Sequence, residues 1–174
     1  MKKTTSGFTI VELLIVIVVI GILAAISVVA YNGIKDRAQK QKIQADLSTL
    51  DRAIRAAQVN TGNTFRVITG VPSGTASPCA AKTAGTDLAA LPKTDACWTE
   101  YIATLNDISD ASGANVRSLV DPWGRPYLID ENENETGPTY CVQDVVAAFA
   151  LPTNGWSAMS GTRRQLPNVA PACL

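Results

Sequence analysis

One uninterrupted apolar stretch, Gly7 to Ala30, constrains this chain more than any other feature of its sequence, and Glu12 is the one charged residue within it. About 20 apolar residues in a helix cross the hydrocarbon core of a bilayer, so the stretch is long enough to span a membrane. A carboxylate inside such a span is costly unless it has a partner. Because no basic side chain lies within helical reach of Glu12, we expect the partner to be a free α-amine, created by cleavage between Gly7 and Phe8.

The residues around this expected cleavage site resemble a known leader. Lys2 and Lys3 precede a string from Ser6 to Leu14, SGFTIVELL, which is similar to the class III leader and N-terminal core of type IV pilins and pseudopilins. In that family a membrane peptidase cuts after the Gly and methylates the new N-terminal Phe. The resemblance implies that residues 1–7 are a cleaved leader and that Phe8 becomes N-methylated. It also implies that Glu12 pairs with the N-terminal amine, commonly of a neighbouring subunit, during filament assembly.

Two other interpretations of the N-terminus compete with this one. A secretory signal peptide would be removed after Val28-Val29-Ala30, but a Glu inside its hydrophobic region disfavours this. An uncleaved signal anchor would leave Glu12 near the membrane interface. Two basic residues precede the stretch and four follow it between residues 35 and 42, so the positive-inside rule alone would place the C-terminal part in the cytoplasm. We favour the leader interpretation, because the motif and the cysteines both place that part outside.

The helical pattern continues beyond the apolar stretch, with a change of polarity. Apolar residues recur at steps near three and four, as in an amphipathic helix. They are Ile34, Ala38, Leu47, Leu50, Ile54 and Ala57. Gly62 suits a left-handed C-cap. We therefore predict one helix from Phe8 to Asn60, with a hydrophobic membrane-spanning or filament-core half at 8–30 and an amphipathic half at 31–60, weakest at Asn32-Gly33.

Residues 61–174 predict a globular head whose first part, residues 61–120, is mainly loop. The segment up to residue 96 is rich in Gly, Pro, Thr, Ser and Ala and predicts a long loop. Residues 98–108 carry large apolar side chains at helical spacing and predict a short helix with a core-facing aromatic side. Those side chains are Trp98, Ile102, Leu105 and Ile108.

The second part of the head, residues 121–174, predicts a small antiparallel sheet. Tyr127–Asp130 predicts the first strand and Tyr140–Leu151 the second, although the Ala content of the latter leaves a helix open. Asn154-Gly155 indicates a hairpin that returns through Trp156–Ser160 as a third strand, followed by an irregular tail. The expected fold class is α+β, with the long N-terminal helix packed on this sheet, as the pilin fold implies.

A tight turn is predicted at Asp121-Pro-Trp-Gly, directly before the first strand. The string from Asp121 to Tyr127 is similar to the DPWG-x-PY segment of the major pseudopilins of type II secretion systems. We interpret it as a packing turn with Trp123 buried.

The four cysteines lie in the second half of the chain and fit two disulfides in a compartment outside the cytoplasm. No CxxC pair exists, which disfavours a zinc site or a redox pair of the thioredoxin type. Three pairings are open. We favour Cys79–Cys97 and Cys141–Cys173, because each joins cysteines that are adjacent in sequence.

An acidic stretch at residues 130–135 raises calcium binding as a hypothesis. Asp130, Glu131, Glu133 and Glu135 offer the hard oxygen ligands that Ca²⁺ prefers. The resemblance adds to it, because major pseudopilins carry a calcium site in the loops after this region. The stretch lacks the arrangement of an EF-hand, and we favour a solvated acidic loop with no cofactor.

Composition disfavours an enzyme or a nucleic-acid-binding protein. The 174 residues carry a formal net charge of zero and include no His, which removes His-based catalysis. The acidic residues form no nucleophile–base pattern, so we expect no enzyme. Arg163 and Arg164 are too few to indicate DNA binding.

Two function classes follow. The resemblance implies a structural subunit of a type IV pilus, inserted in the inner membrane as a single-pass prepilin and then polymerised into an extracellular helical homopolymer. Its roles would be adhesion, twitching motility or DNA uptake, and its partners identical or related pilin subunits, a prepilin peptidase, an assembly ATPase and a platform protein. The alternative within this class is a major pseudopilin that serves protein secretion by a type II system. The second class is a membrane-anchored extracytoplasmic binding domain.

Overall fold

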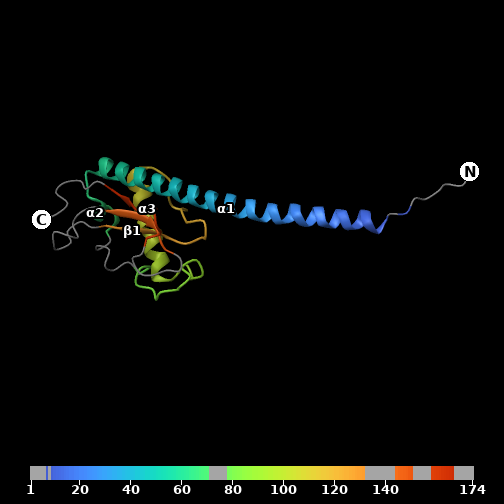
Figure 1. Cartoon of the computed structure of the whole chain (residues 1–174). Coiled ribbons are helices and arrows are strands. Elements are labelled where there is room, and N and C mark those ends of the chain that lie inside the picture. Colours follow the sequence, from blue (N-terminus) through green and yellow to red (C-terminus); the bar gives the residue numbers. More distant parts are fainter. Residues whose placement is uncertain (1–6, 8, 71–77, 132–143, 151–157, 167–174) are drawn as a thin grey trace, which may run out of the picture. The chain divides into compact units, whose positions relative to one another are not determined.

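The computed structural model describes residue 7 and residues 9–70, 78–131, 144–150 and 158–166. These residues form helices α1, α2 and α3 and strands β1, β2 and β3 (Figure 1). Their bounds are α1 Ile10–Thr61, α2 Phe65–Thr69, α3 Ala96–Ser112, β1 Tyr127–Asp130, β2 Val145–Ala148 and β3 Arg164–Gln165. The chain divides into two compact units, Met1–Lys40 and Gln41–Leu174. A long N-terminal helix and a small antiparallel sheet confirm the predicted α+β class.

Helix α1 runs without a break from Ile10 to Thr61 and passes through Asn32-Gly33. It begins at Ile10, after the predicted start at Phe8, because Thr9 is not helical, and it ends at Thr61, just past the predicted Asn60. The predicted cap is confirmed, because Gly62 adopts a positive φ of 67° and donates its N–H to the Gln58 carbonyl at 2.9 Å. The first part of α1, residues 10–30, is called the apolar segment below. It is long and apolar enough to cross a membrane, with a mean hydropathy of 3.3 over 18 residues.

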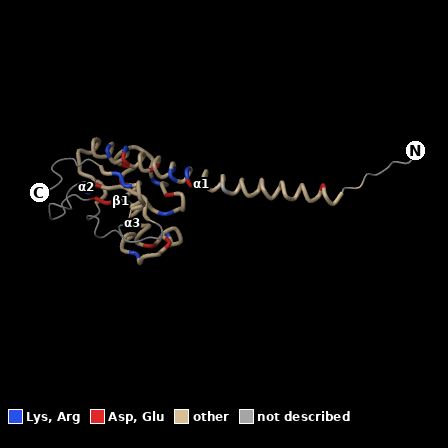
Figure 2. Tube along the Cα trace, in the orientation of Figure 1, with Lys and Arg blue, Asp and Glu red and all other residues tan. Residues whose placement is uncertain are grey.

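The apolar segment buries none of its described side chains. Its large aliphatic residues between Ile10 and Val28 are 47–83 % exposed. Figure 2 shows this part of α1 as a run without charge after one acidic residue near its start, and basic residues follow further along the helix. The segment therefore needs a nonpolar environment that the described residues of its own unit do not supply.

The second part of α1 forms one wall of the head's core. Ile43, Leu47, Leu50 and Ile54 are at most 1 % exposed. The predicted stripe begins later than expected, since Ile34 is 67 % exposed and Ala38 is also exposed. Both of these residues belong to the first unit, in which no described residue is buried.

Helix α3 forms a second wall of the core and is longer than the predicted helix at residues 98–108. Asp95 caps its N-terminus by accepting the Cys97 N–H, and Gly113 ends it with a φ of 75°. The predicted aromatic face is confirmed, because Trp98 and Tyr101 are buried, although Ile102 is 37 % exposed. The side chains of α1, α3, β1 and β2 share one cluster.

The predicted long loop at residues 61–96 is wrong in one place, because it contains α2. Phe65 is fully buried in the main core cluster, and this anchor holds the five-residue helix against the head. Gly70 ends α2 with a φ of 65° and donates its N–H to the Arg66 carbonyl. A helix of five residues is too short to show a periodic hydrophobic pattern, so its presence could not be predicted from periodicity.

The sheet has the order β1-β2-β3 with antiparallel pairing throughout. Strand β1 has the predicted bounds, and Tyr127 pairs with Ala148. All four residues of the central strand β2 are buried, which agrees with the predicted strand over 140–151 and excludes a helix in its described part. The Tyr127 hydroxyl donates to Asp46 of α1 at 2.6 Å and ties the sheet to that helix.

The third strand was predicted at Trp156–Ser160, of which residues 156 and 157 lie outside the described residues. The described third strand is Arg164–Gln165, so the tail beyond Arg163 is not irregular from its start. Ala158 makes only an isolated bridge with Phe149. A turn then interrupts the pairing, and the Thr162 hydroxyl accepts the Ala148 N–H at 3.2 Å in place of a backbone carbonyl. The expected hairpin at Asn154-Gly155 lies outside the described residues.

The turn that opens β1 is confirmed, but its buried residue is not the predicted one. Trp123 is 37 % exposed, whereas Arg125 is 1 % exposed. Asp121 accepts the N–H groups of Trp123 and Arg125 through one carboxylate oxygen, at 2.9 and 2.8 Å. Its other oxygen accepts Arg125 Nε at 2.7 Å, and Arg125 Nη2 donates to the Phe149 carbonyl. The Trp123 ring lies 5.1 Å from the guanidinium carbon, so the partly exposed indole lies over the buried cation.

This buried ion pair yields a prediction about stability. Asp121→Asn leaves the buried Arg125 guanidinium without its counter-charge, which is expected to lower the free energy of unfolding by about 3–5 kcal/mol. Asp110→Asn is the matched control, because its pair with Arg117 is exposed and contributes about 1 kcal/mol or less. Urea unfolding of the full chain in detergent, followed by tryptophan fluorescence, compares the two variants. Equal losses would contradict the assigned role of Asp121.

Candidate functional site

The candidate processing and assembly site lies at the start of α1. Gly7, Thr9 and Glu12 are among the described residues, and Phe8 is not. Helix α1 begins at Ile10, so the Gly7–Phe8 bond precedes the helix in sequence. Cleavage at this bond and methylation of Phe8 stay predictions.

Thr9 and Glu12 bind each other reciprocally. The backbone N–H and the hydroxyl of Thr9 donate to Oε2 of Glu12 at 2.9 and 2.7 Å, and the Glu12 N–H donates to the Thr9 hydroxyl at 3.3 Å. This pattern is a capping box, which satisfies donors that a helix otherwise leaves unpaired at its N-terminus. Residues 9–12 carry the sequence signature of this motif, a Thr followed three residues later by a Glu before an apolar run.

The capping box determines where the Glu12 carboxylate points. It accepts from the N–H of Thr9, which belongs to the peptide bond joining Phe8 and Thr9. The carboxylate therefore faces the N-terminal end of α1, where the helix dipole also favours a negative charge. An amine created at Phe8 would arise one residue from the group that Glu12 already binds. The uncleaved chain thus gives Glu12 a local partner in Thr9, and the pairing of Glu12 with an amine stays a prediction.

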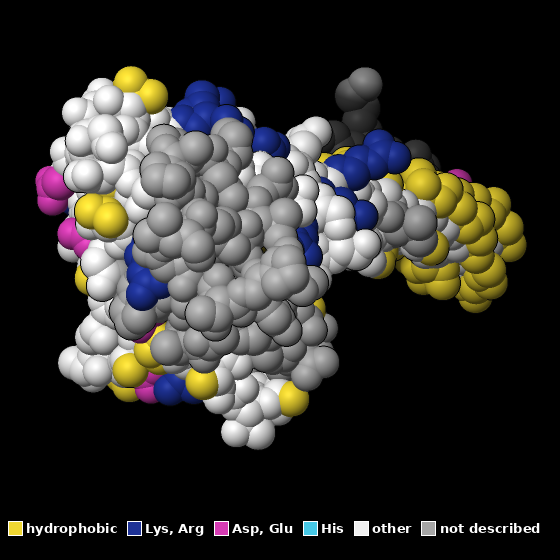
Figure 3. Space-filling model, turned by 90° about the vertical axis from the view of Figure 1, so that its left-hand side faces the viewer, with side chains coloured by type: hydrophobic (Ala, Val, Ile, Leu, Met, Phe, Trp, Pro, Cys, Tyr) yellow, Lys and Arg dark blue, Asp and Glu magenta, His cyan; other side chains and the backbone are white. Residues whose placement is uncertain are grey.

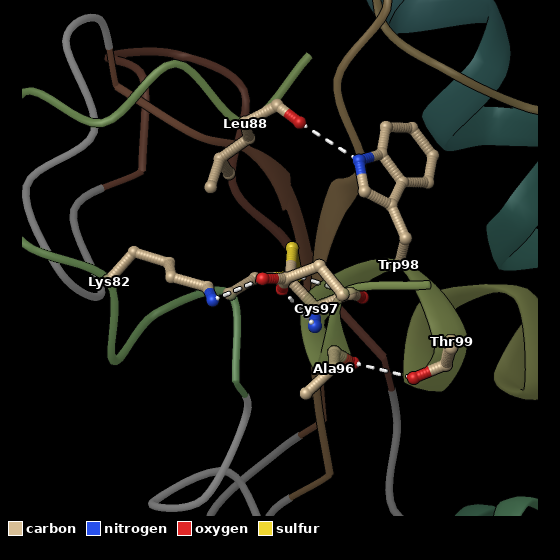
Figure 4. The surroundings of a disulfide bond; sticks show 8 residues. Lys82, Leu88, Ala96, Cys97, Trp98 and Thr99 are labelled. Carbon is tan, nitrogen blue, oxygen red and sulfur yellow. Dashed lines mark hydrogen bonds and ion pairs between the residues drawn. A yellow bond between two sulfur atoms is a disulfide. The ribbon is translucent and has the colours of Figure 1, made fainter. Parts of the chain in front are cut away.

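The head carries the predicted Cys79–Cys97 disulfide, whose Cα atoms are 4.4 Å apart (Figure 4). Two further contacts fasten the same segment to the start of α3. Lys82 pairs with Asp95 at 2.8 Å, and the Trp98 indole N–H donates to the Leu88 carbonyl at 2.9 Å. Residues 78–95 are therefore held by a covalent bond, an ion pair and a hydrogen bond. Cys141 and Cys173 lie outside the described residues, and so does their predicted pairing.

Two of the four calcium candidates are described. Asp130 ends β1, and Glu131 follows it at 3 % exposure, with the Thr69 hydroxyl donating to Oε1 at 3.3 Å. Glu133 and Glu135 lie outside the described residues. Across the part of the chain that the structure describes, no three acidic or cysteine side chains gather as metal ligands do. Calcium binding stays a hypothesis.

Glu131 lines a small cavity of about 20 Å³ together with the disulfide, Glu100 and Tyr127. Burial raises the pKa of Glu131 to about 8, and the nearby charges of Asp144 and Asp130 add to the effect. Burial also raises the pKa of Glu100. With this pKa the Glu131 carboxyl is mostly neutral at physiological pH. A neutral carboxyl can be buried in this cavity without the large free-energy cost of removing a charge from water.

Comparison with known proteins identifies a family motif in the N-terminal segment. Residues 2–28 match the family model of the prokaryotic N-terminal methylation motif. The type II secretion system core protein G of Aeromonas hydrophila is 28 % identical over 127 residues, 72 % of this chain and 73 % of that protein. The type IV major fimbrial protein FimA of Dichelobacter nodosus is 39 % identical over 54 residues, 31 % of this chain and 35 % of that protein.

The chain carries the N-terminal methylation motif and is similar to type IV pilins and pseudopilins. Core protein G of Escherichia coli strain K12 is 44 % identical over 48 residues, 28 % of this chain and 33 % of that protein. The chain thus spans about a third of the length of the fimbrial and Escherichia relatives and nearly three quarters of the Aeromonas one. No solved structure matches the chain. The methylation motif covers Gly7, Phe8, Thr9 and Glu12, the residues of the candidate site.

The disulfide of the head predicts a stability difference. Cys79→Ala together with Cys97→Ala is expected to lower the free energy of unfolding by about 2–4 kcal/mol, because the unfolded chain regains its loop entropy. Lys82→Ala, which removes only the partly exposed ion pair to the same segment, is expected to cost about 1 kcal/mol or less. Urea unfolding at fixed pH measures both. A smaller loss in the double variant than in Lys82→Ala would contradict this ranking.

The buried carboxyl of Glu131 predicts a pH dependence. The unfolded chain ionises this group near the ordinary pKa of 4.5, whereas the folded chain holds its proton until about pH 8. The contribution of Glu131 to stability is therefore fully present below pH 4.5 and is lost as the pH rises toward 8. Unfolding is measured from pH 4.5 to 9 in the wild type and in Glu131→Gln. The difference between the two curves should fall across this window, and a flat difference would refute the assignment.

Proposed function

We propose that the chain is the structural subunit of a type IV pilus filament. In this proposal it enters the inner membrane as a single-pass prepilin, is cleaved after Gly7 and methylated at Phe8, and polymerises through the apolar segment of α1. The proposed role is structural and involves no catalysis. The observation that carries the proposal is the exposed apolar segment with a single carboxylate at its beginning.

The energetics of the apolar segment support polymerisation from a membrane. Burial of each large aliphatic side chain is worth about 1.5–3 kcal/mol, so exposure of the whole segment to water would be prohibitive. Figure 3 shows these side chains as a continuous apolar surface. Lipid covers this apolar surface before assembly, and the apolar segments of identical or related subunits cover it afterwards. The exchange between the two environments costs little, because both are nonpolar.

Glu12 supports the same proposal. In a bundle of apolar helices an unpaired carboxylate is strongly unfavourable, so each added subunit requires a partner for Glu12. The capping box directs the carboxylate toward the N-terminal end of the helix, which is where cleavage would create an amine. Pairing with the amine of a neighbouring subunit would then favour one axial register of the helices.

A second candidate is the major pseudopilin of a type II secretion system. Two observations favour it. The alignment with the Aeromonas core protein G extends over 72 % of the chain, whereas the alignment with the fimbrial protein covers 31 %. The turn from Asp121 to Tyr127 also resembles the pseudopilin segment. The four cysteines and the long segment after α1 favour the pilus.

The proposed partners follow from the cycle of insertion, processing and assembly. They are identical or related pilin subunits, the membrane, a prepilin peptidase, an assembly ATPase and a platform protein. The pilus would lie at the cell surface, whereas a pseudopilus would lie in the periplasm. Adhesion, twitching motility and DNA uptake are the downstream roles that a surface pilus would serve.

The first test is mass spectrometry of the N-terminal peptide from the native organism. The proposal expects an N-methylated Phe8. An intact Met1 would indicate a simple anchor, and a terminus at Tyr31 would indicate a secreted head without an assembly helix. Either result would overturn the filament proposal.

A second test separates the pilus from the pseudopilus. Filaments sheared from the cell surface should contain this chain if it is a pilin. If it is a pseudopilin, deletion of its gene should leave surface filaments intact and retain secreted enzymes in the periplasm.

Substitution of Glu12 tests the assembly step. Glu12→Leu is expected to be inserted and cleaved as in the wild type, but its incorporation into filaments should fall to background because no carboxylate meets the neighbouring amine. Glu12→Asp is the matched control and should retain part of the assembly. Immunoblots of membrane and sheared fractions measure both steps, and normal filaments from Glu12→Leu would contradict the role of this residue.

A further inference from the structure

Three basic residues follow the apolar segment closely. Lys35, Arg37 and Lys40 are exposed, and Asp36 is the one acidic residue among them. Within the described part of the chain, none of the three forms an ion pair. Figure 2 shows basic residues on α1 beginning where the uncharged run ends. We call these three side chains the basic collar.

The basic residues later on α1 differ from the collar, because contacts within the second unit engage them. Lys42 binds Asp46 and donates to the Val120 carbonyl at 2.7 Å. Arg52 donates to the Ser48 and Thr49 hydroxyls, and Arg55 pairs with Asp51. Their roles are therefore accounted for by the packing and solvation of the head, whereas the structure assigns no such role to the collar.

The collar lies at the depth of lipid headgroups when the apolar segment spans a bilayer. About 20 residues from Ile10 cross the hydrocarbon core and bring the chain to Ala30. At about 1.5 Å per residue, Lys35 is about 7.5 Å beyond that point and Lys40 about 15 Å. Long basic side chains extend several ångströms along a helix toward an interface, so all three ammonium and guanidinium groups can reach phosphates. Tyr31, which is 67 % exposed, lies at the boundary where aromatic residues are enriched.

The distribution of the collar around the helix favours lipid over a protein partner. At about 100° per residue, Arg37 and Lys40 lie about 60° apart on one side, and Lys35 lies on the opposite side. A protein partner would contact one face of the helix. A shell of lipid surrounds the helix completely and offers phosphate groups on every side.

We infer that Lys35, Arg37 and Lys40 bind the phosphates of anionic lipid headgroups on the side of the membrane where the head emerges. The inference rests on the membrane-inserted state in the proposed function and is independent of filament formation. It also explains why the chain carries more basic residues after its apolar segment than before it, against the positive-inside pattern. The collar holds the inserted chain at a fixed depth by attraction to phosphate.

The test measures lipid preference around the inserted full-length chain. The chain is reconstituted into phosphatidylcholine vesicles that contain phosphatidylglycerol as a minor component. Electron spin resonance of spin-labelled lipids reports how strongly each lipid associates with the protein. The wild type is expected to enrich phosphatidylglycerol over phosphatidylcholine by at least about twofold at low salt. The preference should vanish near 1 M salt, where the screening length is about 3 Å.

Two charge-matched triple variants identify the residues responsible. The collar variant, Lys35→Gln with Arg37→Gln and Lys40→Gln, should associate equally with both lipids. The control variant, Arg52→Gln with Arg55→Gln and Arg163→Gln, removes the same charge from the head and should retain the wild-type preference. A preference that survives in the collar variant, or that is lost equally in both variants, would overturn the inference.

Resistance to alkaline carbonate extraction, measured on the same vesicles, separates this inference from the proposed function. An inserted chain with no lipid preference would overturn the lipid inference alone. The same result with cross-links between copies at residues 35–40 would assign the collar to a second subunit instead. Extraction of the wild type by carbonate would overturn the membrane step of the proposed function and this inference with it.

Discussion

The exposure of the apolar segment is the constraint on which the rest of this molecule depends. Its large aliphatic side chains are 47–83 % exposed, which in water would cost on the order of 20 kcal/mol in sum. The chain must therefore keep these side chains in lipid or among other helices throughout its life. The single carboxylate of Glu12 accepts two hydrogen bonds from Thr9, directly before the helix, which offset part of the cost of a charge in a nonpolar environment.

Further along the chain, the same continuous helix contributes side chains to the core of the head. Up to Lys40 no described residue of α1 is buried, and from Ile43 onward one face of it is part of the core. The contacts there are specific as well as apolar. Tyr127 of β1 donates to Asp46, and Gln44 donates to the Gly161 carbonyl before β3. The head thus includes the second part of a helix whose first part requires a nonpolar environment, so one continuous helix meets two requirements.

The sequence predicted the parts of this fold whose signals are local and periodic. The extent of α1, the turn before β1 and the bounds of β1 follow from hydrophobic pattern, Gly62 and the Asp-Pro-Trp-Gly string. The predictions differ from the structure where contacts between segments distant in sequence determine the local fold. Phe65 of α2 packs in the core, and β3 follows Thr162, whose hydroxyl accepts the Ala148 N–H. Arg125 is buried in place of Trp123 because Asp121 pairs with it, a partnership that hydrophobicity cannot indicate. At the candidate site the importance of Glu12 follows from its charge in an apolar run, whereas its hydrogen bonds with Thr9 depend on where the helix begins.

The capping box of Thr9 and Glu12 also determines where α1 begins. It fixes the first turn of α1 at Ile10, so the helix cannot extend back through Thr9 without losing the contacts that Glu12 makes. The peptide bond between residues 7 and 8 therefore precedes the helical hydrogen-bond ladder in sequence. A protease requires a backbone that is free of such a ladder. The proposed cleavage after Gly7 would therefore act ahead of the helix whose start Thr9 and Glu12 define.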